Sequence, residues 1–155
     1  MAVREGTLGE NRGTSPFMLR FKVFDNGSPA KKIDLDGACL LGSERVPVRA
    51  EIKFAGGHIT CEPRTRGAVA LCLPWSVAGM GRMMLETVRL LDRPEPYNLH
   101  VELARGQLMR ISQKREDWGL YDYAEGREIY AEIDAARDQL VAAITAPDDA
   151  GAARL

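Results

Sequence analysis

The stretch DRPEPYN, residues 92–98, separates two parts of the chain in which apolar side chains recur at different intervals. Its two prolines continue neither a central strand nor a helix interior. Before this stretch apolar and polar residues alternate, as in β-strands. After it, apolar residues recur at the spacing of one face of an α-helix. The sequence therefore predicts an α+β protein, with a β-rich domain at residues 17–96 and a helical hairpin at residues 97–146.

The clearest strand before this boundary is VPVRAEIKF, residues 46–54. Its apolar side chains alternate with polar or charged ones, which predicts one buried and one solvated face. Pro47 has no N–H to donate, so we expect the start of this strand at a sheet edge or strand end. Roughly six or seven short strands separated by turns predict an antiparallel β-sandwich, jelly-roll-like, or a barrel. The other expected strands are 17–24, 37–42, 58–62, 68–73 (in the middle of a sheet) and 82–91, with PWSVAGMG, residues 74–81, as a loop.

Two helices are expected after the boundary. The first covers residues 97–116 and begins at Asn98 or Tyr97, and we expect Gly106 to permit a close backbone crossing. The second covers about residues 125–145 and ends before a proline. The apolar stripe of the first helix consists of Tyr97, Val101, Ala104, Leu108 and Ile111, and that of the second of Ile129, Ile133, Ala136, Leu140 and Ile144.

The two ends of the chain differ from its middle. Residues 1–16 are polar and glycine-rich and are interpreted as a flexible tail. They contain no apolar signal segment, which favours a cytoplasmic location. Residues 147–155 are interpreted as a tail or as the start of a further helix, with Asp149 as its N-cap.

The composition of the chain argues against two kinds of partner, nucleic acid and a membrane. The net charge of −1 argues against a dedicated nucleic-acid binder. No apolar stretch approaches the roughly 20 residues of a membrane span. Cys39, Cys61 and Cys72 are interpreted as buried thiols, with a disulfide between Cys61 and Cys72 as the alternative in an oxidising compartment.

The motifs of catalysis and metal binding are missing from the sequence. His58 and His100 have no nucleophile motif beside them, and no pair of cysteines or histidines has metal-ligand spacing. We therefore expect no catalytic residue, no metal and no cofactor. GMGR, residues 79–82, is interpreted as a hairpin turn rather than a phosphate loop, because strand-forming residues follow it. The glutamates, such as Glu51, Glu86 and Glu102, are interpreted as solvated surface charges.

Two aromatic sites remain as candidates. Trp75 is expected either to pack on the core or to stack on a sugar ring, because an indole face binds the apolar face of a pyranose. Trp118 continues the first helical stripe, so we expect it to be buried and to fix the end of that helix. Gly119 is expected to reverse the chain, after which Tyr121 and Tyr123 close the corner. The alternatives for Trp118, Tyr121 and Tyr123 are stacking on a sugar and docking another domain.

Several phrases of the chain resemble the N-terminal region of family-10 glycoside hydrolase-like proteins of planctomycete bacteria, of the endo-1,4-β-xylanase type. The resemblance covers about residues 18–145, and this chain has EPYNL where the family pattern is expected to read RPYNL. The phrases are LRFKVFDNGSPA (19–30), VALCLPW (69–75), EPYNL (95–99), VELARG (101–106) and QKREDWGL (113–120).

The resemblance implies a non-catalytic leading module. In that family the chemistry belongs to a downstream (β/α)8 barrel with two catalytic glutamates. This chain is shorter than the roughly 250 residues of such a barrel, so no catalytic residue is carried over. The function expected from the resemblance is a carbohydrate-associated module that binds a xylan-type oligosaccharide or braces the barrel. The alternative is a protein-interaction or assembly module with no carbohydrate role.

Overall fold

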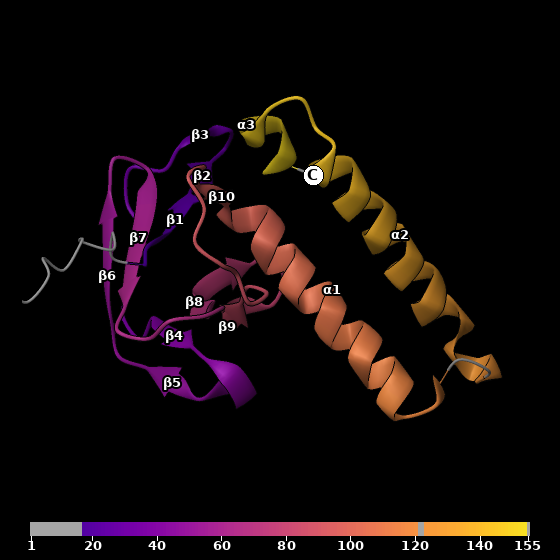
Figure 1. Ribbon diagram of the computed structural model, residues 1–155. Coiled ribbons are helices and arrows are strands. Elements are labelled where there is room, and N and C mark those ends of the chain that lie inside the picture. The colour runs from indigo at the N-terminus through magenta and orange to yellow at the C-terminus, as the bar shows by residue number, and fades with distance from the viewer. Residues whose placement is uncertain (1–16, 121–122, 155) are drawn as a thin grey trace, which may run out of the picture.

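The computed structural model describes residues 17–120 and 123–154, and it confirms a mixed α+β chain whose β-rich part comes first (Figure 1). One four-stranded sheet has the order β10-β1-β7-β6 and the other the order β5-β4-β8-β9, while β2 and β3 form a separate hairpin. The strands are β1 (Leu19–Lys22), β2 (Phe24–Asp25), β3 (Ser28–Pro29), β4 (Cys39–Leu41), β5 (Pro47–Val48), β6 (Ala50–Ala55), β7 (His58–Pro63), β8 (Ala70–Val77), β9 (Gly81–Glu86) and β10 (Tyr97–Asn98).

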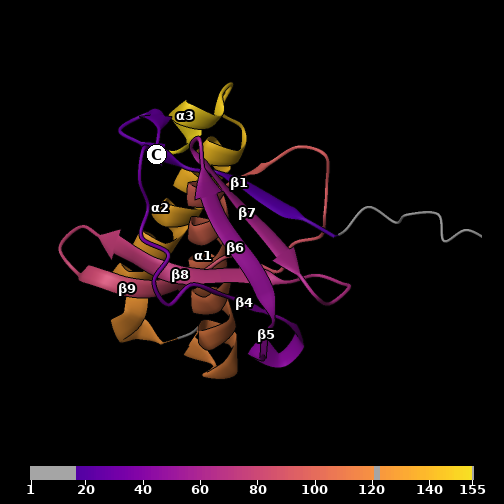
Figure 2. The ribbon, with the colours of Figure 1, turned by 90° about the vertical axis from the view of Figure 1, so that its left-hand side faces the viewer.

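The two sheets share one hydrophobic core, and their strands cross steeply in Figure 2. Leu19, Phe21 and Ile59 supply it from the first sheet, and Leu71 and Leu73 from the second. Neither sheet closes on itself within the described residues. The sandwich or barrel predicted from the sequence is therefore not confirmed, although the antiparallel sheets are.

The predicted strand at residues 46–54 is in fact divided between the two sheets. Pro47 and Val48 form β5, which pairs with β4, whereas Ala50–Ala55 form β6, which pairs with β7. The alternation holds along β6, but Val46, expected inside, is exposed. Pro47 lies in an edge strand, as its missing N–H requires.

Two other boundaries from the sequence are wrong. Residues 74–77 of the expected loop PWSVAGMG continue β8 to Val77, and β9 ends at Glu86 rather than at residue 91. Pro74 fits within β8 because beyond Cys72 this strand pairs only with β9. The short strand β10 was not predicted at all, since two residues carry no periodicity. It runs parallel to β1, with Phe21 opposite Tyr97.

The helices agree with the sequence in position. They are α1 (Leu99–Asp117), α2 (Arg127–Ile144) and the short α3 (Asp149–Ala152), with single 3-10 turns at Ser43–Arg45 and Ala124–Gly126. Asn98 caps α1, because its side chain accepts a hydrogen bond from the His100 N–H. Asp148 rather than Asp149 caps α3.

The helix α1 lies between the sheets and α2 (Figure 1). Leu99 and Leu103 are buried in the core that the sheets form. Val101, Ala104, Leu108 and Ile111 of the predicted stripe instead line a groove against α2. The predicted stripe is therefore the face of α1 that contacts α2. The face of α1 that packs on the sheets was not predicted from the sequence. A Cβ atom on Gly106 would lie 2.2 Å from the Glu86 carbonyl oxygen, which confirms the predicted close crossing.

Candidate functional site

Trp75 lies in the second half of β8, where the strand has only β9 as a neighbour. Its partner in register is Met83. The indole is half-buried and packs against the edge of the core. The His100 imidazole meets it edge-on, with ring centroids 5.0 Å apart. The expected packing on the core is therefore observed, and stacking of this indole on a sugar stays a prediction.

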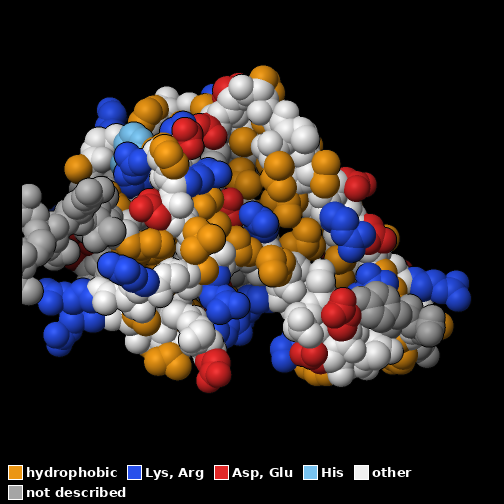
Figure 3. Space-filling model, in the orientation of Figure 1, with side chains coloured by type: hydrophobic (Ala, Val, Ile, Leu, Met, Phe, Trp, Pro, Cys, Tyr) orange, Lys and Arg blue, Asp and Glu red, His pale blue; other side chains and the backbone are white. Residues whose placement is uncertain are grey.

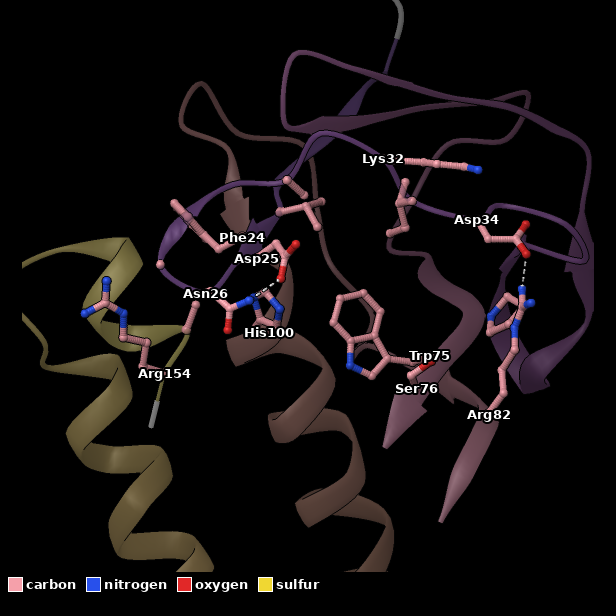
Figure 4. A pocket seen from close by; sticks show the side chains of 16 residues that line it. Phe24, Asp25, Asn26, Lys32, Asp34, Trp75, Ser76, Arg82, His100 and Arg154 are labelled. Carbon is pink, nitrogen blue, oxygen red and sulfur yellow. Dashed lines mark hydrogen bonds and ion pairs between the residues drawn. The ribbon is translucent and has the colours of Figure 1, made fainter. Parts of the chain in front are cut away.

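A cleft of about 610 Å³ opens beside this indole. It is enclosed by the turn between β2 and β3, the segment before β4, the ends of β8 and β9, the first turn of α1 and Arg154, which follows α3. In Figure 4 the indole stands between His100 on one side and Arg82 and Asp34 on the other. The tryptophan is thus one wall of a polar cleft built from segments far apart in sequence.

An ion pair forms the opposite wall of the cleft. An Nη atom of Arg82 lies 2.5 Å from a carboxylate oxygen of Asp34. The other Asp34 oxygen accepts the Asp36 N–H at 2.8 Å. This backbone hydrogen bond, followed by Arg82, lowers the pKa of Asp34 below its usual value. Asp34 is therefore an ionised acceptor at neutral pH, and Arg82 is a donor held in a fixed position.

The floor of the cleft carries an unsatisfied polar atom. His100 Nδ1 is buried and has no hydrogen-bond partner among the described residues. Burial lowers the pKa of His100, and the nearby Asp25 opposes this in part. The Asp25 side chain itself accepts a hydrogen bond from Asn26 at 3.0 Å. A neutral imidazole with a free ring nitrogen thus lies under the indole.

The second predicted aromatic site is not built as expected. Trp118 is 67% exposed, so the prediction that it is buried is wrong. Its backbone N–H ends α1 by donating to Lys114, and the Lys114 ammonium lies 5.8 Å from the centroid of its ring. Gly119 reverses the chain with φ of 60°, as predicted. Tyr123 is exposed, and Tyr121 lies outside the described residues.

The stripe fails at Trp118 because Ile111, about two turns earlier, is already exposed. By this point α1 has passed beyond the sheets, so no core remains for the indole to join (Figure 1). Trp75 and Trp118 lie at opposite ends of the helix, one beside its first turn and the other at the cap residue that follows its last turn. The structure does not bring them into one site.

The carboxylates also depart from expectation. Glu51 is exposed and pairs with Lys53, as expected of a surface charge. Glu86 is partly buried and pairs with Arg45. Glu102 is buried, and burial raises its pKa even though Arg105 lies 3.5 Å away. In the described ranges, no three His, Cys, Asp or Glu side chains converge as a metal site would require.

Sequence reasoning missed the polar partners of Trp75. Asp34, Arg82 and His100 are far apart in the chain and belong to no motif. The one available signal was the extension of β8, since a strand through Pro74 and Trp75 would have placed Arg82 opposite Ser76.

Comparison with known proteins does not show which family the chain belongs to. No family model matches the chain, and neither the curated proteins nor the solved structures contain a match. Within residues 17–120 and 123–154, none of the helices combines the length and apolar character needed to cross a bilayer.

Proposed function

We propose that this chain is a non-catalytic, carbohydrate-associated module that binds an oligosaccharide in the cleft beside Trp75. The observation that carries the proposal is the position of the indole between His100 and the Arg82–Asp34 pair (Figure 4). A pyranose presents an apolar face and a rim of hydroxyl groups. An aromatic wall with a few fixed donors and acceptors suits both features.

The charged wall supports recognition of hydroxyl groups. The Asp34 carboxylate accepts hydrogen bonds and the Arg82 guanidinium donates them, so together they can bind neighbouring hydroxyls of one ring. The resemblance to the N-terminal region of xylanase-type proteins favours a xylan-type oligosaccharide as the ligand.

The proposal assigns no catalytic role to the cleft. Glycoside hydrolysis needs one carboxyl group with a raised pKa as general acid. The pKa of Asp34 is shifted in the opposite direction. We expect the purified chain alone to hydrolyse neither xylan nor an aryl xyloside, and turnover lost on Asp34→Ala would contradict this.

Fluorescence tests the sugar site directly, because the chain contains only two tryptophans. In the Trp118→Phe variant Trp75 is the single indole, and titration with xylo-oligosaccharides is expected to shift its emission. Arg82→Ala in this background should weaken binding without unfolding the chain, since Arg82 is exposed. An unchanged emission spectrum together with no binding on a glycan array would refute the proposal.

A second function is favoured by the exposed end of the helical hairpin. Trp118 and Tyr123 both present large aromatic surface to solvent there. Such residues are enriched in protein interfaces, which fits a role in bracing a catalytic (β/α)8 barrel or assembling with another protein. Loss of binding to a separately produced barrel in Trp118→Ala, with sugar binding unchanged, would support this role.

A further inference from the structure

A second cleft, distinct from the one beside Trp75, is lined by arginines. It has a volume of about 840 Å³ and lies between the loop after β7, the loop after β9 and α1. Arg66, Arg89, Arg93 and Arg105 line it, and no aspartate or glutamate does. We call it the arginine groove. Lys and Arg side chains gather between the sheets and α1 on the face shown in Figure 3.

Two of these arginines are held in place by the protein. The Arg93 guanidinium lies 3.6 Å from the centroid of the Tyr97 ring, and its Nε donates to the Glu95 carbonyl at 2.9 Å. Arg105 lies 3.5 Å from the Glu102 carboxylate, which is buried behind it. Fixed guanidinium groups lose little further conformational entropy on binding a ligand.

The other two arginines have no charged partner among the described residues. Neither Arg66 nor Arg89 forms an ion pair or a side-chain hydrogen bond with any residue that the structure describes. Like charges that converge without a counter-charge raise the electrostatic potential of the groove. An anionic ligand would relieve that repulsion.

The groove continues into a neighbouring cleft of about 530 Å³ along α1. The two clefts share Arg89 and Met109, and the second adds Arg110 and Lys114. This neighbouring cleft also contains three carboxylates, Glu44, Glu86 and Asp117; Glu86 is paired with Arg45, and Asp117 lies 3.9 Å from Lys114. The excess of positive charge is therefore concentrated in the arginine groove itself, which suits a short ligand segment with several anionic groups.

We infer that the arginine groove binds a carboxylate-rich peptide segment of a partner protein. Arginine guanidinium groups pair with carboxylates through two parallel hydrogen bonds. Leu91 and Met109 expose apolar side chains beside the arginines, and these can contact the apolar residues of a peptide. Nucleic acid fits less well, because the net charge is −1 and the one aromatic ring in the groove, Tyr97, is buried beneath Arg93.

Anisotropy of a fluorescein-labelled peptide of alternating Glu and Leu tests this inference on the whole chain. Binding is expected at low salt and should weaken as salt increases, whereas the matched Gln–Leu peptide should not bind. The double variant Arg66→Gln/Arg89→Gln should bind the acidic peptide at least about tenfold more weakly. The matched control is Arg127→Gln/Arg137→Gln, which removes the same charge from α2 and should bind normally.

Three outcomes would overturn the inference. They are equal binding of the Gln–Leu peptide, equal weakening in the α2 control, and tighter binding of single-stranded DNA than of the acidic peptide. Thermal unfolding of each variant shows whether it is folded before binding is measured. Trp75→Phe should leave peptide binding unchanged, so the outcome is independent of the sugar-binding proposal.

Discussion

The Trp75 indole and the His100 imidazole meet edge to face, with 5.0 Å between ring centroids and 76° between ring planes. This contact joins the second half of β8 to the first turn of α1. It fixes one side of the indole and leaves another side toward the cleft (Figure 4). The neutral form of His100 suits this position, since burial disfavours the imidazolium ion and lowers the pKa of the side chain.

The first prediction concerns pH and His100. Its folded-state pKa lies below the reference value of 6.5, so the neutral ring stabilises the fold above that pH. This stability should be lost as pH falls through the folded-state pKa. Urea unfolding between about pH 7.5 and about pH 5.5 should show the loss, and His100→Phe, which keeps an aromatic ring, should reduce it. His58→Gln removes the only other histidine and is the control. A loss that persists in His100→Phe would contradict the assignment.

The second prediction concerns the crossing of α1 over β9. In Gly106→Ala the new methyl group would meet the Glu86 carbonyl oxygen at 2.2 Å and the Thr87 carbonyl carbon at 3.0 Å. Overpacking of this kind costs about 1–3 kcal/mol, against roughly 1 kcal/mol gained in helix propensity. We expect a net loss in the free energy of unfolding. Ser112→Ala in the same helix lacks the clash and should be close to neutral, and equal effects of the two substitutions would disprove the packing argument.

The sequence predicted elements well wherever one face of a segment meets the core. The burial of Leu19, Phe21 and Val23 and the cap at Asn98 follow from local patterns. The division of residues 46–54 between two sheets does not, because alternation is the same whichever sheet a strand joins. The candidate site was least predictable. Trp75 was identified by its residue type, but its polar neighbours Asp34, Arg82 and His100 come from three separate segments whose meeting depends on tertiary packing alone.

The third prediction concerns the cysteines. Cys39 and Cys72 lie opposite each other on β4 and β8, whereas Cys61 is in the other sheet, so Cys61 and Cys72 are not the strand neighbours that the alternative pairing assumed. Glutathione disulfide should oxidise Cys39 and Cys72 to a disulfide while it is itself reduced to two molecules of glutathione, whose thiols take up the two protons, and peptide mapping should detect the new bond. Burial raises the pKa of Cys72 to about 11 and that of Cys61 to about 12, so alkylation should be slow at neutral pH. Rapid alkylation of Cys61 in the folded chain would contradict its burial.

The fourth prediction concerns Glu102. Burial raises its pKa, so the protonated form fits the fold best and stability should be lost as pH rises through the folded-state pKa. Its Oε2 lies 3.5 Å from Arg105 but forms no hydrogen bond with it. Glu102→Gln should therefore raise the free energy of unfolding near neutral pH, with a gain that shrinks as pH falls through the raised folded-state pKa and is gone below the reference value of 4.5. The control Glu116→Gln changes an exposed residue of the same helix. A destabilised Glu102→Gln at neutral pH would show that the charge is needed.

The last prediction compares how substitutions near the two ends of α1 change the melting temperature. Trp118 is 67% exposed and lies past the sheets, so Trp118→Ala should change the melting temperature little. Leu103 is 3% exposed in the shared core, and truncating such a side chain costs about 2–5 kcal/mol. Leu103→Ala should therefore lower the melting temperature by many degrees in the same assay. If Trp118→Ala destabilises the chain as much as Leu103→Ala, the indole is buried and the end of α1 is a structural joint. If melting is unchanged and binding of a partner domain is lost, Trp118 belongs to an interface, which is the outcome that its exposure and its position beside Gly119 favour.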